Sequence, residues 1–168
     1  MLKKFTSHGG AERHLALFET RRQLSIMIDY QFGRGASRGL PKNGLEFVYS
    51  RRSERVRQVL LDRELFATVR PNGALALTVH AASILAKSKA FLQNAVTVED
   101  EAVTFVKEGR SVFCKFVVAV GDHVLPGGDV VILDRKGAVI GVGRAKMNGR
   151  HMREFKAGAA VKVRGSYE

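Results

Sequence analysis

Residues 100–133 read DEAVTFVKEGRSVFCKFVVAVGDHVLPGGDVVIL, and this stretch decides the fold of the second half of the chain. Its acidic start and the glycine that ends its periodic part predict a helix over 101–107 with Asp100 as the N-cap. The next run is dense in Val and Phe and predicts one strand over 111–120. A Pro-Gly-Gly turn then leads into a second predicted strand over 129–133.

The flanking sequence adds more short extended segments. Arg135-Lys136-Gly137 predicts a hairpin into a strand over 138–144. Residues 96–98 and 160–164 are predicted to be extended, whereas 147–156 is ambiguous and could form a helical turn. Short strands with glycine-rich turns at spacings of about 8–12 residues predict a small closed β-barrel.

The first half of the chain mixes helix and strand. A helix is predicted over 11–32, although Ile26-Met27-Ile28 could instead open a strand. The other predicted elements are extended segments over 45–49, 55–61, 65–69 and 74–79 and a helix over 80–90. The best boundary lies within 87–94. We therefore predict an α+β protein with an α+β domain over 1–93 and a β-barrel domain over 94–168.

The charge of the chain predicts a polyanionic partner. Its 168 residues include 28 Lys and Arg against 16 Asp and Glu, a net charge of +12 with a pI near 10.3. Residues 1–95 carry +9 of this excess and residues 96–168 carry +3. Part of it is an arginine-rich segment, which comprises Arg34, Arg38, Lys42, Arg51, Arg52, Arg55 and Arg57. The guanidinium fork suits phosphate oxygens, although a solvated charged surface explains such a run equally simply.

Composition also excludes several classes of protein. The chain is too short for an α/β barrel of about 250 residues. It has neither an apolar run of about 20 residues nor a signal-peptide apolar region, so we expect a cytoplasmic protein without a membrane partner. Cys114 is the single cysteine, which excludes an internal disulfide and a multi-cysteine metal site.

No catalytic, metal-binding or cofactor-binding motif is evident. The five histidines have no metal-ligand spacing, and Cys114 is expected to be a small core residue. The glycine pairs at Gly33-Arg34-Gly35 and Gly141-Val142-Gly143 are not predicted to open a helix, as a dinucleotide site requires. Asp29 lies among apolar and aromatic residues, and a structural hydrogen-bonding role is the simpler interpretation. We predict no catalytic residues, no metal and no cofactor.

The second half resembles the PUA domain, which is named for pseudouridine synthases and archaeosine transglycosylases. The resemblance spans residues 96–165 and rests on motifs in a fixed order, namely Asp100–Val103, Phe105–Phe113, Lys115–Val117, Pro126-Gly127 with Asp129-Val130, Gly143–Ala145, Phe155–Gly158 and Ala160–Arg164. The departure is Gly128, since the family's turn often runs directly from Pro-Gly to acidic residues. We do not expect this residue to alter the fold.

The first half is similar to the domain that precedes PUA in archaeal tRNA-guanine transglycosylases and their archaeosine synthase relatives. The most specific motif is Asp29-Tyr30-Gln31-Phe32-Gly33, followed by Val56–Val59 and Leu65–Gly73. In the full-length enzyme a large barrel supplies the aspartate nucleophile, guanine recognition and a zinc site, for which this chain has no room. The resemblance therefore implies the RNA-binding part without base exchange.

The resemblance also implies where RNA would bind. PUA domains hold structured RNA in a groove formed by the short helix, its glycine and the next strand, and Gly109 allows close backbone approach there. We expect Gly109, Arg110 and Ser111 to line this groove, with further cations at Lys107, Lys115, Arg144, Lys146, Lys162 and Arg164, although these residues could equally form the solvent face of a barrel. The arginine-rich segment would extend the contact through Arg34, Arg38, Arg51, Arg52, Arg55 and Arg57. Trp is absent and aromatics make up 8%, so recognition by shape and charge is expected rather than stacking on single strands.

Three functional hypotheses follow. The first is non-catalytic binding of structured RNA, foremost tRNA, as the RNA-binding subunit of a split archaeosine tRNA-guanine transglycosylase with a separate catalytic subunit. The second is a ribosome-associated, rRNA-binding protein. The third is an enzyme with its site around Asp29 and Tyr30, which no motif supports.

Overall fold

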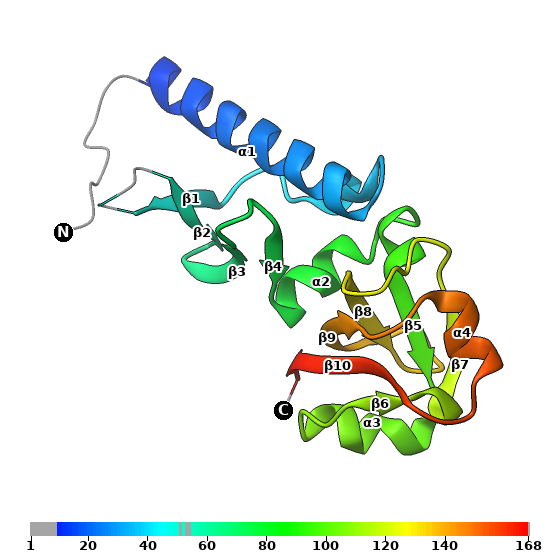
Figure 1. The fold of residues 1–168 in the computed structure, drawn as a ribbon. Helices are drawn as coiled ribbons and strands as arrows, with labels where there is room; N and C mark the ends of the chain where they lie inside the picture. Colours follow the sequence, from blue (N-terminus) through cyan, green and yellow to red (C-terminus); the bar gives the residue numbers. More distant parts are fainter. Residues whose placement is uncertain (1–9, 51, 53–54, 168) are drawn as a thin grey trace.

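The computed structural model describes residues 10–50, 52 and 55–167, with the side chains of residues 10–19 left out of the description. Sheet A and α1 form one end of the molecule, and sheet B with its short helices forms the other (Figure 1). The elements of the first half are α1 (Gly10–Phe32), η1 (Ala36–Gly39), β1 (Leu45–Tyr49), β2 (Val56–Leu61), β3 (Glu64–Val69), β4 (Leu75–Leu77), α2 (Val79–Leu85) and η2 (Phe91–Asn94).

Sheet A is an antiparallel meander in the order β1-β2-β3-β4, with α1 packed against it. Leu24, Ile28 and Phe32 recur every four residues, and all three are buried in the core that α1 shares with the sheet. The strand alternative for residues 26–28 is wrong, because Ile28 belongs to this helical stripe while Ile26 remains exposed.

The segment around β4 is shorter than predicted. Residues 74–79 were expected to be extended, but the side chain of Thr78 accepts a hydrogen bond from the amide of Ala81 and starts α2 at Val79. The helix predicted to continue to residue 90 ends at Leu85. A further correction concerns the predicted loop after Gly35, which contains the single turn η1.

Sheet B is a six-stranded, nearly closed barrel in the order β6-β10-β9-β8-β5-β7. The elements of the second half are β5 (Ala95–Val98), α3 (Asp100–Lys107), β6 (Val112–Phe113), η3 (Cys114–Phe116), β7 (Val117–Val120), β8 (Asp129–Leu133), β9 (Val139–Ala145), α4 (Gly149–Glu154) and β10 (Ala159–Ser166). The β5–β8 pair is parallel and the other pairs are antiparallel. The predictions of an α+β fold and a small barrel are confirmed.

The prediction of one strand over 111–120 is wrong. β6 pairs with β10 at one edge of the sheet, whereas β7 pairs with β5 at the other edge. The turn η3 lies between them and carries the chain from one edge to the other, which brings the barrel close to closure. Cys114 in this turn is buried, as expected for a small core residue.

Two helix starts in the barrel differ from prediction. Asp100 is the first residue of α3, and Glu99 occupies the N-cap without a capping side-chain bond. The Glu99 carboxylate instead accepts a hydrogen bond of 2.7 Å from Arg135. The ambiguous segment 147–156 forms α4, whose N-cap Asn148 accepts from the amide of His151 at 2.9 Å.

The barrel packs directly on the first half of the chain. In β8, Val130 and Ile132 belong to the barrel core, whereas Val131 and Leu133 belong to the core of the first half. The outer face of the barrel is therefore buried where it meets sheet A and its helices. The 93/94 division proposed from the sequence falls within η2, where Phe91 packs edge-on against Phe32 at 5.2 Å between ring centroids.

Candidate nucleic-acid interface

The turn after α3 presents bare backbone to solvent. Gly109 has φ +73°, its amide donates to the carbonyl of Val106 at 2.9 Å, and the residue is exposed. This left-handed conformation ends the helix and favours glycine. A Cβ built at Gly109 would meet no heavy atom within 4 Å, so the surface in front of the turn is open.

Two phenylalanines hold the cations beside this turn. The Arg110 guanidinium lies 4.7 Å from the ring centroid of Phe105, and the Lys115 ammonium lies 4.6 Å from that of Phe116. The two rings are 5.6 Å apart, so they form one aromatic support that positions both cations. Together with Lys107, Gly109 and Ser111, the residues Arg110 and Lys115 make up what we call the α3 site.

The carboxyl end of α3 is also tied to the last strand. Lys107 and Arg110 are exposed, and Ser111 is half-buried. The hydroxyl of Ser166 donates to the carbonyl of Lys107 at 3.1 Å. Arg110 further approaches Glu108 at 3.4 Å, an exposed ion pair that contributes little stability.

A second group of predicted residues lies on the outer face of β9 and β10. Lys162 is directly opposite Arg144 in the antiparallel register. Lys146 comes directly after the end of β9, and Lys162 and Arg164 are exposed while Val161 and Val163 are buried. We call Arg144, Lys146 and Lys162 the β9–β10 group. β10 lies between β9 and β6 in the sheet, so Lys162 lies on the strand next to β6.

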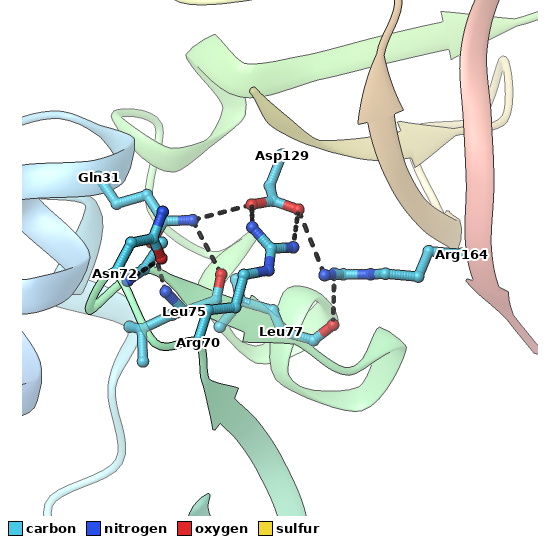
Figure 2. Close-up of polar contacts among 8 residues, drawn as sticks. Gln31, Arg70, Asn72, Leu75, Leu77, Asp129 and Arg164 are labelled. Carbon is cyan, nitrogen blue, oxygen red and sulfur yellow. Dashed lines mark hydrogen bonds and ion pairs between the residues drawn. The ribbon is translucent and has the colours of Figure 1, made fainter. Parts of the chain in front are cut away.

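Arg164 takes part in a polar cluster between the two halves of the chain. Asp129 is its centre, with a side chain only 8% exposed (Figure 2). Arg70 donates to both carboxylate oxygens, at 2.7 and 2.8 Å. Gln31 donates to Asp129 at 3.1 Å, and Arg164 lies 3.3 Å from the carboxylate while donating to the carbonyl of Leu77 at 3.0 Å. We call these four side chains the junction cluster.

The two arginines of the junction cluster have different electrostatic surroundings. The hydrogen bonds to Asp129 raise the pKa of Arg70. Burial lowers the pKa of Arg164, and repulsion from Arg70 and Arg144 acts in the same direction, although the charge of Asp129 opposes both. Asp129 and Leu77 thus hold the side chain of Arg164 at the junction between the two halves. Its contact with RNA stays a prediction.

The arginine-rich segment is spread over the first half. Arg34 and Arg38 flank η1, whereas Arg52, Arg55 and Arg57 lie at or beside the β1–β2 turn, and all five are exposed. Arg51 falls outside the described residues. The β1–β2 turn is at the end of sheet A away from the barrel (Figure 1), so Arg52, Arg55 and Arg57 lie apart from the α3 site.

The side chains considered for catalysis lie in three different environments: Asp29 is hydrogen-bonded, Tyr30 is exposed and Cys114 is buried. Asp29 accepts a hydrogen bond of 2.8 Å from the amide of Ser37. Burial alone would raise the pKa of Asp29, but hydrogen bonds from the amides of Ser37 and Gly35 outweigh it and lower that pKa. Tyr30 is 94% exposed, and burial raises the pKa of the Cys114 thiol.

Within residues 10–50, 52 and 55–167, no group of His, Cys, Asp and Glu side chains could hold a metal ion. In the same residues, no helix combines the length and the apolar character needed to cross a membrane.

The fold and these surfaces belong to a PUA-containing class of protein. Residues 94–167 match the PUA domain, and residues 22–91 match the patch-forming domain C2 of tRNA-guanine transglycosylase. The chain therefore carries a C2 domain followed by a PUA domain, as its motifs predicted. The order is shared with a particular family of enzymes.

Archaeal tRNA-guanine(15) transglycosylases contain a homologous C-terminal region. The chain is 31% identical over 151 residues to the enzyme of Thermococcus onnurineus, which covers 89% of this chain and 26% of the relative. It is 35% identical over 144 residues to that of Pyrococcus abyssi, which covers 85% of this chain and 24% of the relative. The chain thus spans about a quarter of the length of these relatives.

Solved structures show the same fold. A hypothetical protein from Pyrococcus horikoshii OT3 superposes with a TM-score of 0.67 at 22% identity, over 88% of this chain and 90% of the other. A conserved PUA domain protein from Thermoplasma acidophilum gives a TM-score of 0.64 at 20% identity, over 89% of both chains.

Proposed function

We propose that the chain binds structured RNA, and tRNA in particular, without catalysing a reaction on it. The observation that carries the proposal is the α3 site, where open glycine backbone lies between cations held on an aromatic pair, in a domain of the PUA family. The C2 domain and the tRNA-guanine(15) transglycosylase relatives favour tRNA over other RNAs.

The biological role that fits these features is an RNA-binding subunit of an archaeosine tRNA-guanine transglycosylase whose catalytic barrel lies in another chain. Asp29 accepts a hydrogen bond from the amide of Ser37 and Cys114 is buried, which supports a non-catalytic role. The barrel subunit would bring the base-exchange chemistry, and this chain would hold the tRNA. We place this function in the cytoplasm.

Contact is expected through the sugar-phosphate backbone. Gly109 lets the RNA approach main-chain groups, while Arg110 and Lys115 supply charge on either side. Such contacts fix position and carry little sequence information. The RNA is therefore selected by its folded shape.

A salt titration of tRNA binding tests the proposal. If about 6 phosphates are neutralised, log affinity falls against log salt with a slope of roughly −4 to −5. A slope near zero, or no binding of tRNA at moderate salt, would overturn it. Co-sedimentation of the native protein with ribosomal particles, rather than co-purification with a barrel subunit, would support the rRNA-binding alternative.

A pair of glycine variants tests the α3 site itself. Gly109→Ala and Gly137→Ala both place a methyl group at positive φ, +73° and +82°, and neither new Cβ meets an atom within 4 Å. Both variants therefore carry a similar backbone strain of about 1–2 kcal/mol. We expect Gly109→Ala alone to weaken tRNA binding, about tenfold or more, because only that methyl group stands in the RNA contact. Equal affinities for the two variants would contradict the site.

A further inference from the structure

The carboxylate of the junction cluster leaves the neighbouring Arg144 without an ion-pair partner among the described residues. Asp129 is the carboxylate of the cluster: its two oxygens accept two hydrogen bonds from Arg70 and one from Gln31, and Arg164 lies within ion-pair distance at 3.3 Å. A carboxylate has about four lone-pair positions, so its capacity is filled. Arg144 stands directly opposite Asp129 in the β8–β9 register but makes no ion pair with it.

Arg144 also faces a second cation. Lys162 lies opposite it on β10, and both side chains project from the outer face of the sheet. Residues directly opposite across two strands have Cβ atoms about 4.5–5.5 Å apart, and like charges in this position are destabilising. Within the described residues, no carboxylate comes within ion-pair distance of Arg144, Lys146 or Lys162.

We propose that Arg144 and Lys162 together bind one backbone phosphate of the RNA at the edge of the junction between the two domains. The inference rests on the proposed function and adds a contact outside the α3 site. A phosphate between the two cations would turn their mutual repulsion into two charge-assisted hydrogen-bonding contacts. Arg164, held by Asp129 and Leu77, increases the positive potential beside it.

The position of this phosphate site has a structural consequence. Asp129 and Arg144 are cross-strand neighbours, and Asp129 is bonded to Arg70 and Gln31 of the first half. An RNA that binds Arg144 and Lys162 therefore lies beside the line where the two domains meet. Charge from the first half can then act on the same RNA.

The test compares two double variants that remove the same charge. Arg144→Gln with Lys162→Gln removes the proposed site, and Lys136→Gln with Arg153→Gln removes two exposed cations that make no ion pair with a described residue. We expect the first to weaken tRNA binding about tenfold at moderate salt and to reduce the magnitude of the salt slope by about 1. The control should lose less than about threefold.

Melting temperature provides a second readout. Because Lys162 faces Arg144 and no described carboxylate lies within ion-pair distance of it, Lys162→Gln alone should leave the melting temperature unchanged or raise it. A clearly lower melting temperature would overturn the proposal, as would equal affinities for the two double variants. If the unmodified chain fails to bind tRNA at all, the proposed function falls first, so the two failures are distinguishable.

Discussion

Replacement of Asp129 by Asn tests the junction cluster directly. The amide keeps the shape of the side chain but loses its charge and turns one acceptor into a donor that faces guanidinium groups. Removing one partner of a buried ion pair costs about 3–5 kcal/mol. The side chains of Arg70 and Arg164 are 23% and 33% exposed, so water offsets part of this cost. We therefore expect the free energy of unfolding to fall by about 2–3 kcal/mol.

Thermal unfolding is the assay. A loss of 1 kcal/mol lowers the melting temperature by about 2–4 °C in a chain of this size, so Asp129→Asn should melt roughly 4–12 °C lower. Asp122→Asn is the matched control, since Asp122 is exposed and makes no ion pair with a described residue. Its melting temperature should stay within about 1 °C of the original.

Arg70→Lys separates geometry from charge. Lysine keeps the positive charge but cannot reproduce the two parallel hydrogen bonds that Arg70 makes to Asp129. We expect a smaller loss than for Asp129→Asn, about 1–2 kcal/mol. If Asp129→Asn and its control Asp122→Asn have the same melting temperature, the junction cluster does not stabilise the contact between the domains, and the reasoning is refuted.

Three further predictions follow from single residues. Asp29→Ala should cost about 1 kcal/mol of stability by leaving the Ser37 amide unbonded, whereas Asp29→Asn should cost less. Because the pKa of Asp29 is lowered in the folded state, the stability that its carboxylate contributes is present above the ordinary pKa of 3.8 and is lost as pH falls through the lowered pKa, which acid unfolding of the variants measures. The buried Cys114 thiol, whose pKa is raised, should resist a thiol reagent in the native protein and react on unfolding. Gly121→Ala should unfold the chain or lower its melting temperature strongly, since a Cβ there would clash with the backbone carbonyl of Gln93, whereas Gly73→Ala, at φ +83° in open space, should cost only about 1–2 kcal/mol of backbone strain.

The elements that could be predicted from the sequence are those with local causes. The bounds predicted for β1 and β8 agree with the structure, because turn residues flank runs of β-forming residues. α1 could be predicted from the length of its helical pattern and from the glycine that follows its end. The hairpin at Gly137 could be predicted from its turn residues. The PUA resemblance then supplied the order of the remaining strands.

The elements that could not be predicted depend on distant partners. Residues 111–120 have a uniform Val- and Phe-rich pattern, and their break at η3 arises because β6 and β7 pair with opposite edges of the sheet. Asp129 looked like an ordinary turn acid, although its partners lie 59 and 98 residues away. The contacts of Phe105 and Phe116 with Arg110 and Lys115 could not be predicted from the sequence, because the two rings come together only in the folded chain.

The core that the two halves share fixes where the unevenly distributed positive charge lies relative to the barrel. Residues 1–95 hold most of the positive excess, and the exposed arginines of the arginine-rich segment flank η1 or lie at or beside the β1–β2 turn. Val131 and Leu133 of β8 pack into the core of the first half, so these arginines keep a fixed position relative to the barrel. A short RNA stem covers less of this surface than a folded RNA does. A folded RNA can meet several of these arginines, which is the physical reason to expect that the chain discriminates tRNA from short duplexes by reach as well as by local shape.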